Sequence, residues 1–345
     1  MGTKRTKEQQ REELLEQVKR MLEKEGLEGW NYAKETMLSQ KMHSRQLREI
    51  MNHIAEHPDF FRPAVVSLCS QAVGGTPEVT IPTGASLILL GKAIGIHDDI
   101  IDNLKVRNQR PTAFGKFGKE MALILSDVLL FKAFTLLRKN AEIGVPYRAV
   151  NDILETIDYI WFEQAEGEAL EIQSRRRTDL TPKECLAKIR MRASEMEAIA
   201  RIGGILGGGS EKEIRALGEY GRSIGIASLL RDELIDLLEV DALRHRLENE
   251  SLPFPLIYAS QSGKTGSKIT PATSKRKLTK ENLRAVSLAS NEAGGLTYTA
   301  NLITQMVKGA TLELSLLKTT TKELKALAVS LAIDPKDWKP LMRPT

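Results

Sequence analysis

Two groups of acidic residues have the spacing and the chemistry of a metal site. Each group places carboxylates at positions i, i+1 and i+4 and follows an apolar segment, Leu87 to Ile96 in one case and Ile224 to Leu230 in the other. On a helix, positions i and i+4 lie one turn apart on the same face, where unpaired like charges are destabilising. The groups are Asp98, Asp99 and Asp102, and Asp232, Glu233 and Asp236. One such group is weak evidence because acidic helix ends are common, whereas two groups of the same spacing predict a shared function.

Carboxylates on two facing helices can hold Mg²⁺, a hard cation that takes oxygen ligands, keeps several waters and shares its coordination shell with substrate phosphates. The expected substrate is therefore a diphosphate. Its carbon–oxygen bond ionises readily only when the cation left behind is stabilised, and Mg²⁺ together with Arg and Lys neutralises the leaving group. An allylic diphosphate meets this requirement. We expect the cofactor to be Mg²⁺, with all six carboxylates as metal ligands and the five aspartates as catalytic residues.

Helices must position these carboxylates, because apolar residues recur at i, i+3 and i+4 over long windows and no alternating strand pattern is present. This predicts an all-α antiparallel bundle of roughly ten or more helices with a central cavity. We expect residues 1–345 to form a single domain, in which residues 1–40 form a peripheral N-terminal helix. The Gly/Ser/Thr/Lys-rich composition of residues 262–280 predicts a mobile basic loop, which is either a solvated insertion or a flap over an anionic ligand.

The composition of the chain excludes several classes of function. Of its 345 residues, 41% are hydrophobic and only two, Cys69 and Cys185, are cysteines, which excludes a disulfide framework and favours a cytoplasmic location. The N-terminus lacks an apolar signal-peptide region, and Lys92 interrupts the most apolar stretch, so we expect no transmembrane segment. The net charge of +5 comes from interleaved acids and bases, and aromatic residues make up only 5% of the chain, which argues against nucleic-acid binding.

The acidic groups lie within a longer series of motifs that resembles the trans-isoprenyl diphosphate synthases and the class I terpene synthases, which share one helical fold. The resemblance covers roughly Arg62 to Tyr258. The matching motifs are Arg107 to Thr112, Ser126-Asp127-Val128-Leu129-Leu130 and Gly167-Glu168-Ala169-Leu170-Glu171. The resemblance implies an isoprenoid-synthase-type bundle, an allylic prenyl diphosphate substrate, a homodimer and peripheral membrane contact for hydrophobic products. The residues expected to bind the substrate are Arg62, Arg107, Arg192 and Arg231.

The departures from the family pattern fall mostly at one subsite, which binds isopentenyl diphosphate in the chain-elongating members. The family has a lysine, a histidine and an arginine where this chain has Asp59, Gly91 and Asn108. Each charge-assisted contact to a phosphate is worth roughly 1.5–3 kcal/mol, so the loss of three weakens binding by several powers of ten unless other cations compensate. The candidates for compensation are Lys92, Lys264 and Lys268.

Three functions remain open at this point. The departures favour an enzyme that ionises a single allylic diphosphate and then cyclises, deprotonates or hydrates the cation, as class I terpene synthases do. The alternatives are a trans-prenyltransferase that lengthens an allylic diphosphate with isopentenyl diphosphate, and a weakly active regulatory subunit of a prenyl diphosphate synthase. In the family, a bulky aromatic five residues before the first aspartate gives short products. Here that residue is Ala93, and Leu90 lies one turn earlier, so we expect substrates of about C15 or longer.

Overall fold

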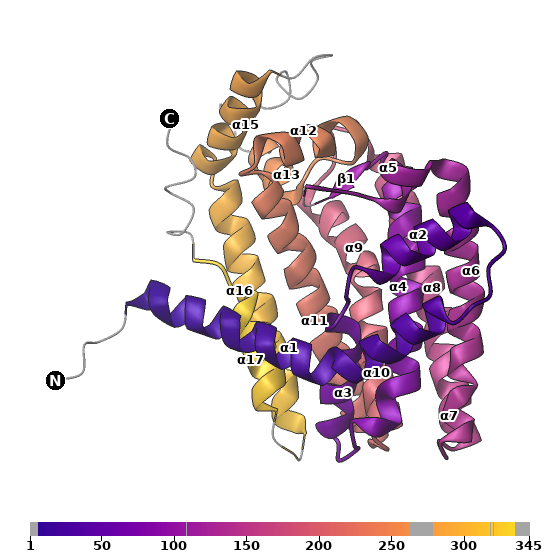
Figure 1. The fold of residues 1–345 in the computed structure, drawn as a ribbon. Coiled ribbons are helices and arrows are strands. Elements are labelled where there is room, and N and C mark those ends of the chain that lie inside the picture. Colours follow the sequence, from indigo (N-terminus) through magenta and orange to yellow (C-terminus); the bar gives the residue numbers. More distant parts are fainter. Residues whose placement is uncertain (1–5, 108, 262–278, 318, 320, 335–345) are drawn as a thin grey trace. The chain divides into compact units, whose positions relative to one another are not determined.

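The computed structural model describes residues 6–107, 109–261, 279–317, 319 and 321–334 and consists almost entirely of α-helices (Figure 1). Within these residues the only strands are β1 (Val106–Arg107) and β2 (Arg110–Pro111), an antiparallel pair in which Arg107 lies opposite Arg110. The predicted all-α class is therefore confirmed.

The contacts within the chain define two compact units. The first unit comprises Met1–Ile157, Ile199–Leu217 and Leu314–Ser330, and the second comprises Asp158–Ala198, Gly218–Glu313 and Leu331–Thr345. Three helices contribute residues to both units: α8 (Tyr147–Ser174), α10 (Ser194–Leu206) and α11 (Glu211–Asp236). The interpretation of the chain as a single domain stays a prediction, as does the mobile basic loop, because residues 262–278 lie outside the described residues.

The first unit begins with a long helix and ends with a short one. Besides β1, β2 and parts of the shared helices, its elements are α1 (Lys7–Leu38), α2 (Arg45–Ala55), α3 (Phe61–Gln71), the 3-10 helix η1 (Glu78–Thr80), α4 (Ile81–Ile101), α5 (Ala113–Phe117), α6 (Lys119–Leu137), α7 (Lys139–Glu142), the 3-10 helix η2 (Leu314–Leu316) and α17 (Lys322–Ser330). Polar residues set the starts of its helices. Thr6 and Gln9 form a reciprocal capping box at α1, and the Ser44 hydroxyl accepts from the Leu47 amide at α2.

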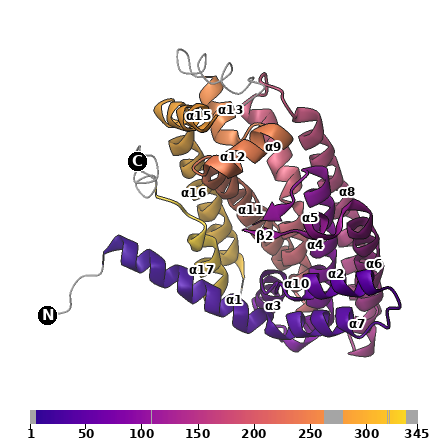
Figure 2. The same cartoon turned by 45° about the horizontal axis from the view of Figure 1, so that its top comes forward.

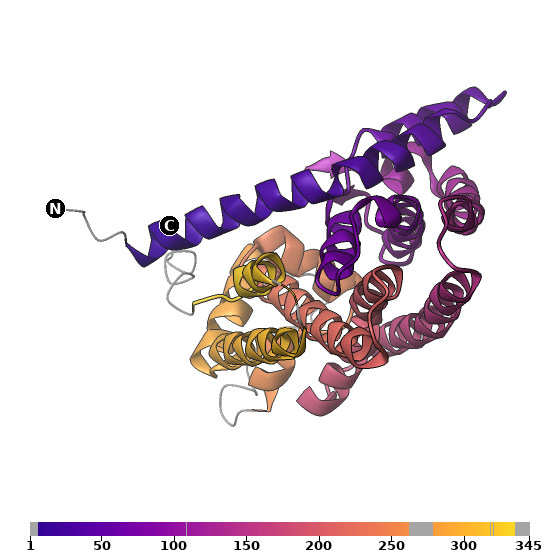
Figure 3. The same cartoon turned by 90° about the horizontal axis from the view of Figure 1, so that it is seen from below.

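Helix α4 forms the centre of the first unit. It is apolar over nearly all of its length and lies among neighbouring helices of this unit, packing against α1, α3 and α6 (Figure 3). Residues such as Leu89 and Ala93 are therefore fully buried. Among the described residues, the segment Glu78–Ile101 is also the one helix that is long and apolar enough to cross a membrane. Because 72% of its most apolar window is buried inside the protein, its composition is explained by its place in the core.

In the second unit, several helices pack around α13. Besides its parts of the shared helices, its elements are α9 (Pro182–Arg192), α12 (Val240–Asn249), α13 (Phe254–Ser260), α15 (Lys280–Glu292) and α16 (Gly295–Glu313) (Figure 2). Helix α13 packs against α9, α15 and α16, and its Tyr258 ring stacks on Tyr298 of α16 with the ring centres 4.0 Å apart. The backbone amide of its first residue, Phe254, donates to Glu233 of the second acidic group.

Candidate functional site

The first acidic group lies at the C-terminal end of α4, in the first unit. Asp98 and Asp99 belong to the last turn, and the backbone amide of Asp102, the C-cap residue, donates to the Asp98 carbonyl. Asn103 then adopts a left-handed backbone with φ of 52°, which ends the helix and directs the chain into the β1–β2 hairpin. Asp98 and Asp102 are half-buried, whereas Asp99 is buried.

The hairpin returns Arg107 to the first acidic group. Arg107 Nη2 donates to Asp99 Oδ1 at 2.8 Å, while more than half of the Arg107 side chain stays exposed. Burial raises the pKa of Asp99, and the hydrogen bond and charge of Arg107 oppose that rise. Asp99 therefore orients Arg107, a residue predicted to bind substrate.

The second acidic group lies at the C-terminal end of α11, in the second unit, and its three members have different surroundings. Asp232 is exposed. Glu233 is only 4% exposed, and its Oε2 accepts from the Phe254 backbone amide at 2.7 Å. Burial raises the pKa of Glu233, and the positive charge of Arg246 opposes this rise. Glu233 is therefore tied to the start of α13, while Asp232 next to it faces solvent.

Arg246 of α12 contacts three carboxylates in this region. Its Nη2 and Nε lie 2.7 and 3.0 Å from Asp236 Oδ2, and its Nη1 lies 2.9 Å from Glu250 and 3.7 Å from Glu233. Burial alone would lower the pKa of the Arg246 guanidinium, but the three carboxylates together raise it. The sequence analysis did not identify Arg246, because its distance from Asp236 along the chain is not a helical spacing.

A buried ion pair lies in the same unit. Lys188 Nζ of α9 is 2.5 Å from Glu171 Oε2 of α8 and donates to the Ser251 hydroxyl at 2.6 Å, and the Ser251 amide donates to Glu171 Oε1 at 2.7 Å. Both charged side chains are 3% exposed. Burial would raise the pKa of Glu171, but the charges of Lys188 and Arg192 outweigh it and lower that pKa. This pair fixes the segment that leads into α13, and nothing in the sequence pattern indicated that Lys188 is buried.

The predicted substrate-binding arginines have different partners. Arg107 contacts Asp99, as described above, and Arg62 of α3 is paired with Asp59, with Nη1 and Oδ2 2.6 Å apart. Arg192 lies 3.3 Å from Glu168 and 4.0 Å from Glu171, two carboxylates of the predicted family motif on α8. Arg231 Nε is buried and has no hydrogen-bond partner among the described residues.

The residues present fit Mg²⁺ by the chemistry of their donor atoms, since both groups offer only carboxylate oxygens, the ligands that hard cations prefer. Within the described part of the chain, no three His, Cys, Asp or Glu side chains form a cluster that could hold a metal by themselves. Mg²⁺ usually binds through one or two carboxylates, waters and substrate phosphates, so it does not require such a cluster. Which of the six carboxylates bind the metal stays a prediction.

Three lysines are the candidates to replace the charge missing from the isopentenyl diphosphate subsite. Lys92 Nζ instead donates to the backbone carbonyls of His57 and Ile54, at 2.7 and 3.3 Å. Asn108 lies outside the described residues, and so do the two other lysines proposed to compensate for lost charge, Lys264 and Lys268.

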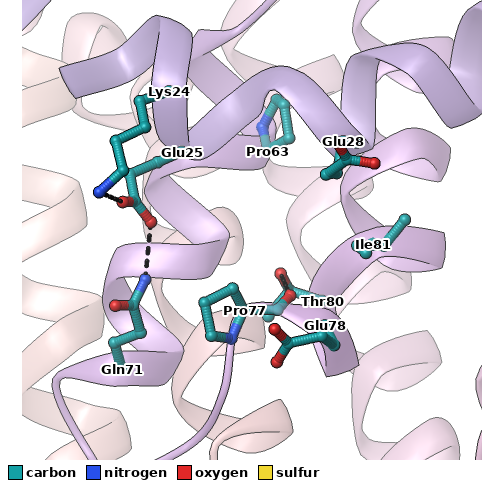
Figure 4. Close-up of a pocket in the computed structure, with 10 residues that line it drawn as sticks. Lys24, Glu25, Glu28, Pro63, Gln71, Pro77, Glu78, Thr80 and Ile81 are labelled. Carbon is teal, nitrogen blue, oxygen red and sulfur yellow. Dashed lines mark hydrogen bonds and ion pairs between the residues drawn. The ribbon is translucent and has the colours of Figure 1, made fainter. Parts of the chain in front are cut away.

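A pocket of about 360 Å³ in the first unit has a different lining from the predicted site (Figure 4). Three glutamates line it, and one of them, Glu25, accepts from Gln71 at 2.8 Å and lies 3.6 Å from Lys24 Nζ. The other two are Glu28 and Glu78. None of the predicted site residues lines this pocket, so it gives no support to the prediction of a diphosphate site.

Comparisons with known proteins find similar sequences among proteins that are named as prenyl diphosphate synthases. The family model described as polyprenyl synthetase matches residues 44–287, well over half of the chain. A short chain isoprenyl diphosphate synthase of Methanothermobacter thermautotrophicus is 34% identical over 178 residues, which are 51% of this chain and 54% of that protein. A geranylgeranyl diphosphate synthase of Methanosarcina mazei is 29% identical over 273 residues, 78% of this chain and 83% of that protein. The matched part of this chain thus spans about half the length of the first relative and most of the second.

The fold has close counterparts among solved structures. The crystal structure of a geranylgeranyl pyrophosphate synthetase from Pyrococcus horikoshii superposes with a TM-score of 0.82 at 24% identity, over 92% of this chain and 98% of that one. The expected isoprenoid-synthase-type fold is therefore confirmed.

Proposed function

The chain belongs to the polyprenyl synthetase family, and from this premise we propose that it is a Mg²⁺-dependent trans-prenyltransferase that lengthens an allylic prenyl diphosphate with isopentenyl diphosphate. The relatives found by comparison are named as prenyl diphosphate synthases. They support this two-substrate reaction better than the single-substrate cyclisation, elimination or hydration that the departures at Asp59 and Gly91 favoured. A regulatory subunit has no observation in its favour.

The observation that carries the proposal is that the carboxylates within each acidic group differ in burial. One carboxylate in each group is buried and held by the protein, Asp99 by Arg107 and Glu233 by the Phe254 amide. The more accessible members, Asp98, Asp102 and Asp232, are the ones that we propose as metal ligands. Mg²⁺ usually keeps several waters, so an accessible carboxylate reaches the hydrated ion more readily than a buried one.

When bound, Mg²⁺ neutralises the diphosphate and makes it a better leaving group. The residues of the chain then have separate roles. Arg107, oriented by Asp99 and still half exposed, binds an oxygen of the allylic diphosphate, and Arg192 and Arg231 add positive charge in the second unit. Arg62 is the proposed contact to the second diphosphate. Helix α4 supplies Ala93, a small buried residue, toward the hydrocarbon, which supports substrates of about C15 or longer.

A homodimer in the cytoplasm is part of the proposal. Helix α6 exposes apolar side chains at helical spacing, and the Phe131 side chain is 77% exposed. The others on this helix are Ile124, Val128 and Phe134. Contiguous exposed apolar residues mark interaction surfaces, and a second copy of the chain is the occupant that we propose. Sedimentation of the wild type and of Phe131→Glu tests this, with a dimer for the first and a monomer for the second as the expected result.

Product analysis tests the proposed reaction. The purified protein is incubated with Mg²⁺, labelled isopentenyl diphosphate and one of three allylic substrates: geranyl, farnesyl or geranylgeranyl diphosphate. We expect label in a longer prenyl diphosphate. Diphosphate release without incorporation of label would overturn prenyl transfer in favour of the single-substrate reaction, and neither release nor incorporation in the folded protein would favour the regulatory subunit.

A further inference from the structure

Asp59 and Arg62 form a closely held ion pair at the start of α3, in the first unit. Asp59 Oδ2 lies 2.6 Å from Arg62 Nη1, and Oδ1 accepts from the backbone amides of Phe61 and Arg62 at 3.1 and 3.3 Å. The Asp59 side chain is 14% exposed and that of Arg62 25%. Both carboxylate oxygens therefore have protein donors, and the pair is too buried to be an ordinary surface salt bridge.

The guanidinium of Arg62 rests against α4 at Gly91. A Cβ atom on residue 91 would lie 2.2 Å from Arg62 Nε and 2.3 Å from Arg62 Cζ, so any other residue at this position would push the guanidinium away. Gly91 thus makes room for the Arg62 side chain in the orientation that Asp59 holds. Gly91 and Asp59, which stand where the family has a histidine and a lysine, therefore both determine the position of the Arg62 side chain.

Lys92, the neighbouring cation, does not replace the charge of Arg62 that Asp59 neutralises. Lys92 Nζ donates to the carbonyls of His57 and Ile54 at the end of α2 and lies 5.2 Å from the centre of the Trp30 ring. Its hydrogen-bonding capacity is therefore largely directed into the protein. In the Asp59–Arg62 pair, Arg62 is the cation that a second diphosphate would engage.

We propose that Asp59 is an internal anion that occupies Arg62 in place of a phosphate, and that it sets the affinity of this chain for the second diphosphate. The inference rests on the proposed two-substrate function. A diphosphate that approaches Arg62 competes with the Asp59 carboxylate for the guanidinium and is repelled by that carboxylate. Asp59 is thus a specificity-determining residue that weakens binding of isopentenyl diphosphate relative to the allylic substrate.

Asp59→Asn separates the charge of Asp59 from its structural role. The asparagine side-chain oxygen can still accept from the amides of Phe61 and Arg62, so the first turn of α3 keeps this acceptor. Only the negative charge of the Asp59 carboxylate, which faces the guanidinium, is lost. Asp59→Ser is a second variant that also keeps a side-chain oxygen near these amides, in case the asparagine variant folds poorly. Asp179→Asn is the matched control, because Asp179 pairs with Arg177 on the surface of the other unit, at 2.9 and 3.0 Å.

The primary measurement is the dissociation constant of isopentenyl diphosphate by calorimetry, with Mg²⁺ and without an allylic substrate, so that no turnover occurs. We expect Asp59→Asn to bind about tenfold or more tightly than the wild type, because one charge-assisted contact becomes available. Asp179→Asn should bind like the wild type. In steady-state assays, the KM for isopentenyl diphosphate should fall in the same proportion, while kcat and the KM for the allylic substrate change little.

Unchanged or weaker binding by folded Asp59→Asn and Asp59→Ser would overturn the proposal for Asp59. If the wild type elongates prenyl chains in that case, the proposed function stands without it. Tighter binding by the variants together with no elongation by any of the proteins would support the role of Asp59 and overturn the prenyltransferase function instead. An equal gain in affinity in Asp179→Asn would mean that the tighter binding comes from the change in net charge alone, and it would also overturn the proposal.

Discussion

Arg246 and Asp236 are joined by two hydrogen bonds to a single oxygen, since Arg246 Nη2 and Nε lie 2.7 and 3.0 Å from Asp236 Oδ2. The same guanidinium is close to Glu233 and Glu250, so one largely buried cation balances three carboxylates. Arg246→Met keeps most of the side-chain volume but leaves these carboxylates without their counter-charge. We expect the free energy of unfolding to fall by about 3 kcal/mol or more, measured by urea denaturation.

The control for Arg246 is Arg215→Met, which removes an exposed i,i+4 pair with Glu211 on α11. Such a pair contributes within about 0.5 kcal/mol, so this variant should unfold like the wild type. Equal losses of stability in the two variants would contradict the structural role of Arg246.

Asp232 and its neighbour Glu233 should respond differently to neutralisation. Asp232→Asn removes an exposed proposed metal ligand, so we expect a rate loss of a hundredfold or more, on the order of 3 kcal/mol in the barrier, with a melting temperature close to that of the wild type. Glu233→Gln keeps an acceptor for the Phe254 amide but removes the charge facing Arg246, so its main effect should be on stability. Activity assays and thermal melts of both variants check this. A rate loss at Glu233 with no loss of stability would make Glu233 a ligand as well.

The sequence predicted the fold class and the two acidic groups because both depend on spacing along one helix. Apolar residues at i, i+3 and i+4 indicated the helices, and the i, i+1, i+4 spacing of carboxylates indicated Asp98 and Asp232. Spacing alone does not say which side of the helix end faces the interior. The surroundings of Asp99 and Glu233 depend on the β1–β2 hairpin and on the start of α13, which lie outside the helices that carry these two residues.

The partners of the charged residues could not be predicted for the same reason. Lys188 and Glu171 are 17 positions apart and come from two helices, so their pairing depends on how α8 and α9 pack. The pair of Asp59 and Arg62 has i,i+3 spacing and was visible in principle. A position-by-position comparison with the family pattern does not reveal it, because such a comparison treats the replaced residue, Asp59, and the kept residue, Arg62, separately.

Ala93→Phe tests whether α4 limits the length of the hydrocarbon. Ala93 is fully buried, so a phenyl ring at this position must occupy space between helices, at a cost of about 1–3 kcal/mol from overpacking. Under the proposed function, we expect the products to shift toward shorter chains, as measured by chromatography of the dephosphorylated alcohols.

Ala93→Leu is a milder variant, should the phenylalanine variant be unstable. Gly95→Ala is the control on the same helix, because a Cβ at Gly95 meets no atom within 4 Å. An unchanged product length in both Ala93 variants would mean that the tail lies elsewhere.

Lys92 should make the stability of the protein depend on pH in the alkaline range. Burial lowers the pKa of Lys92 from its usual 10.5 to about 8, with Asp59 opposing the shift and Arg62 adding to it. Between these two values the unfolded chain keeps the proton that the folded protein has released. Raising the pH through this window therefore favours the folded state, whereas below about pH 8 both states are protonated and the contribution is constant.

Lys92→Met removes this titration. We expect the free energy of unfolding of the wild type, relative to Lys92→Met, to rise as the pH increases from about 8 to 10.5, measured by urea denaturation at several pH values. Lys19→Met, at an exposed position on α1, controls for the loss of a surface lysine and should show a constant difference. A difference between wild type and Lys92→Met that is equally constant would show that Lys92 stays protonated in the folded protein throughout this range.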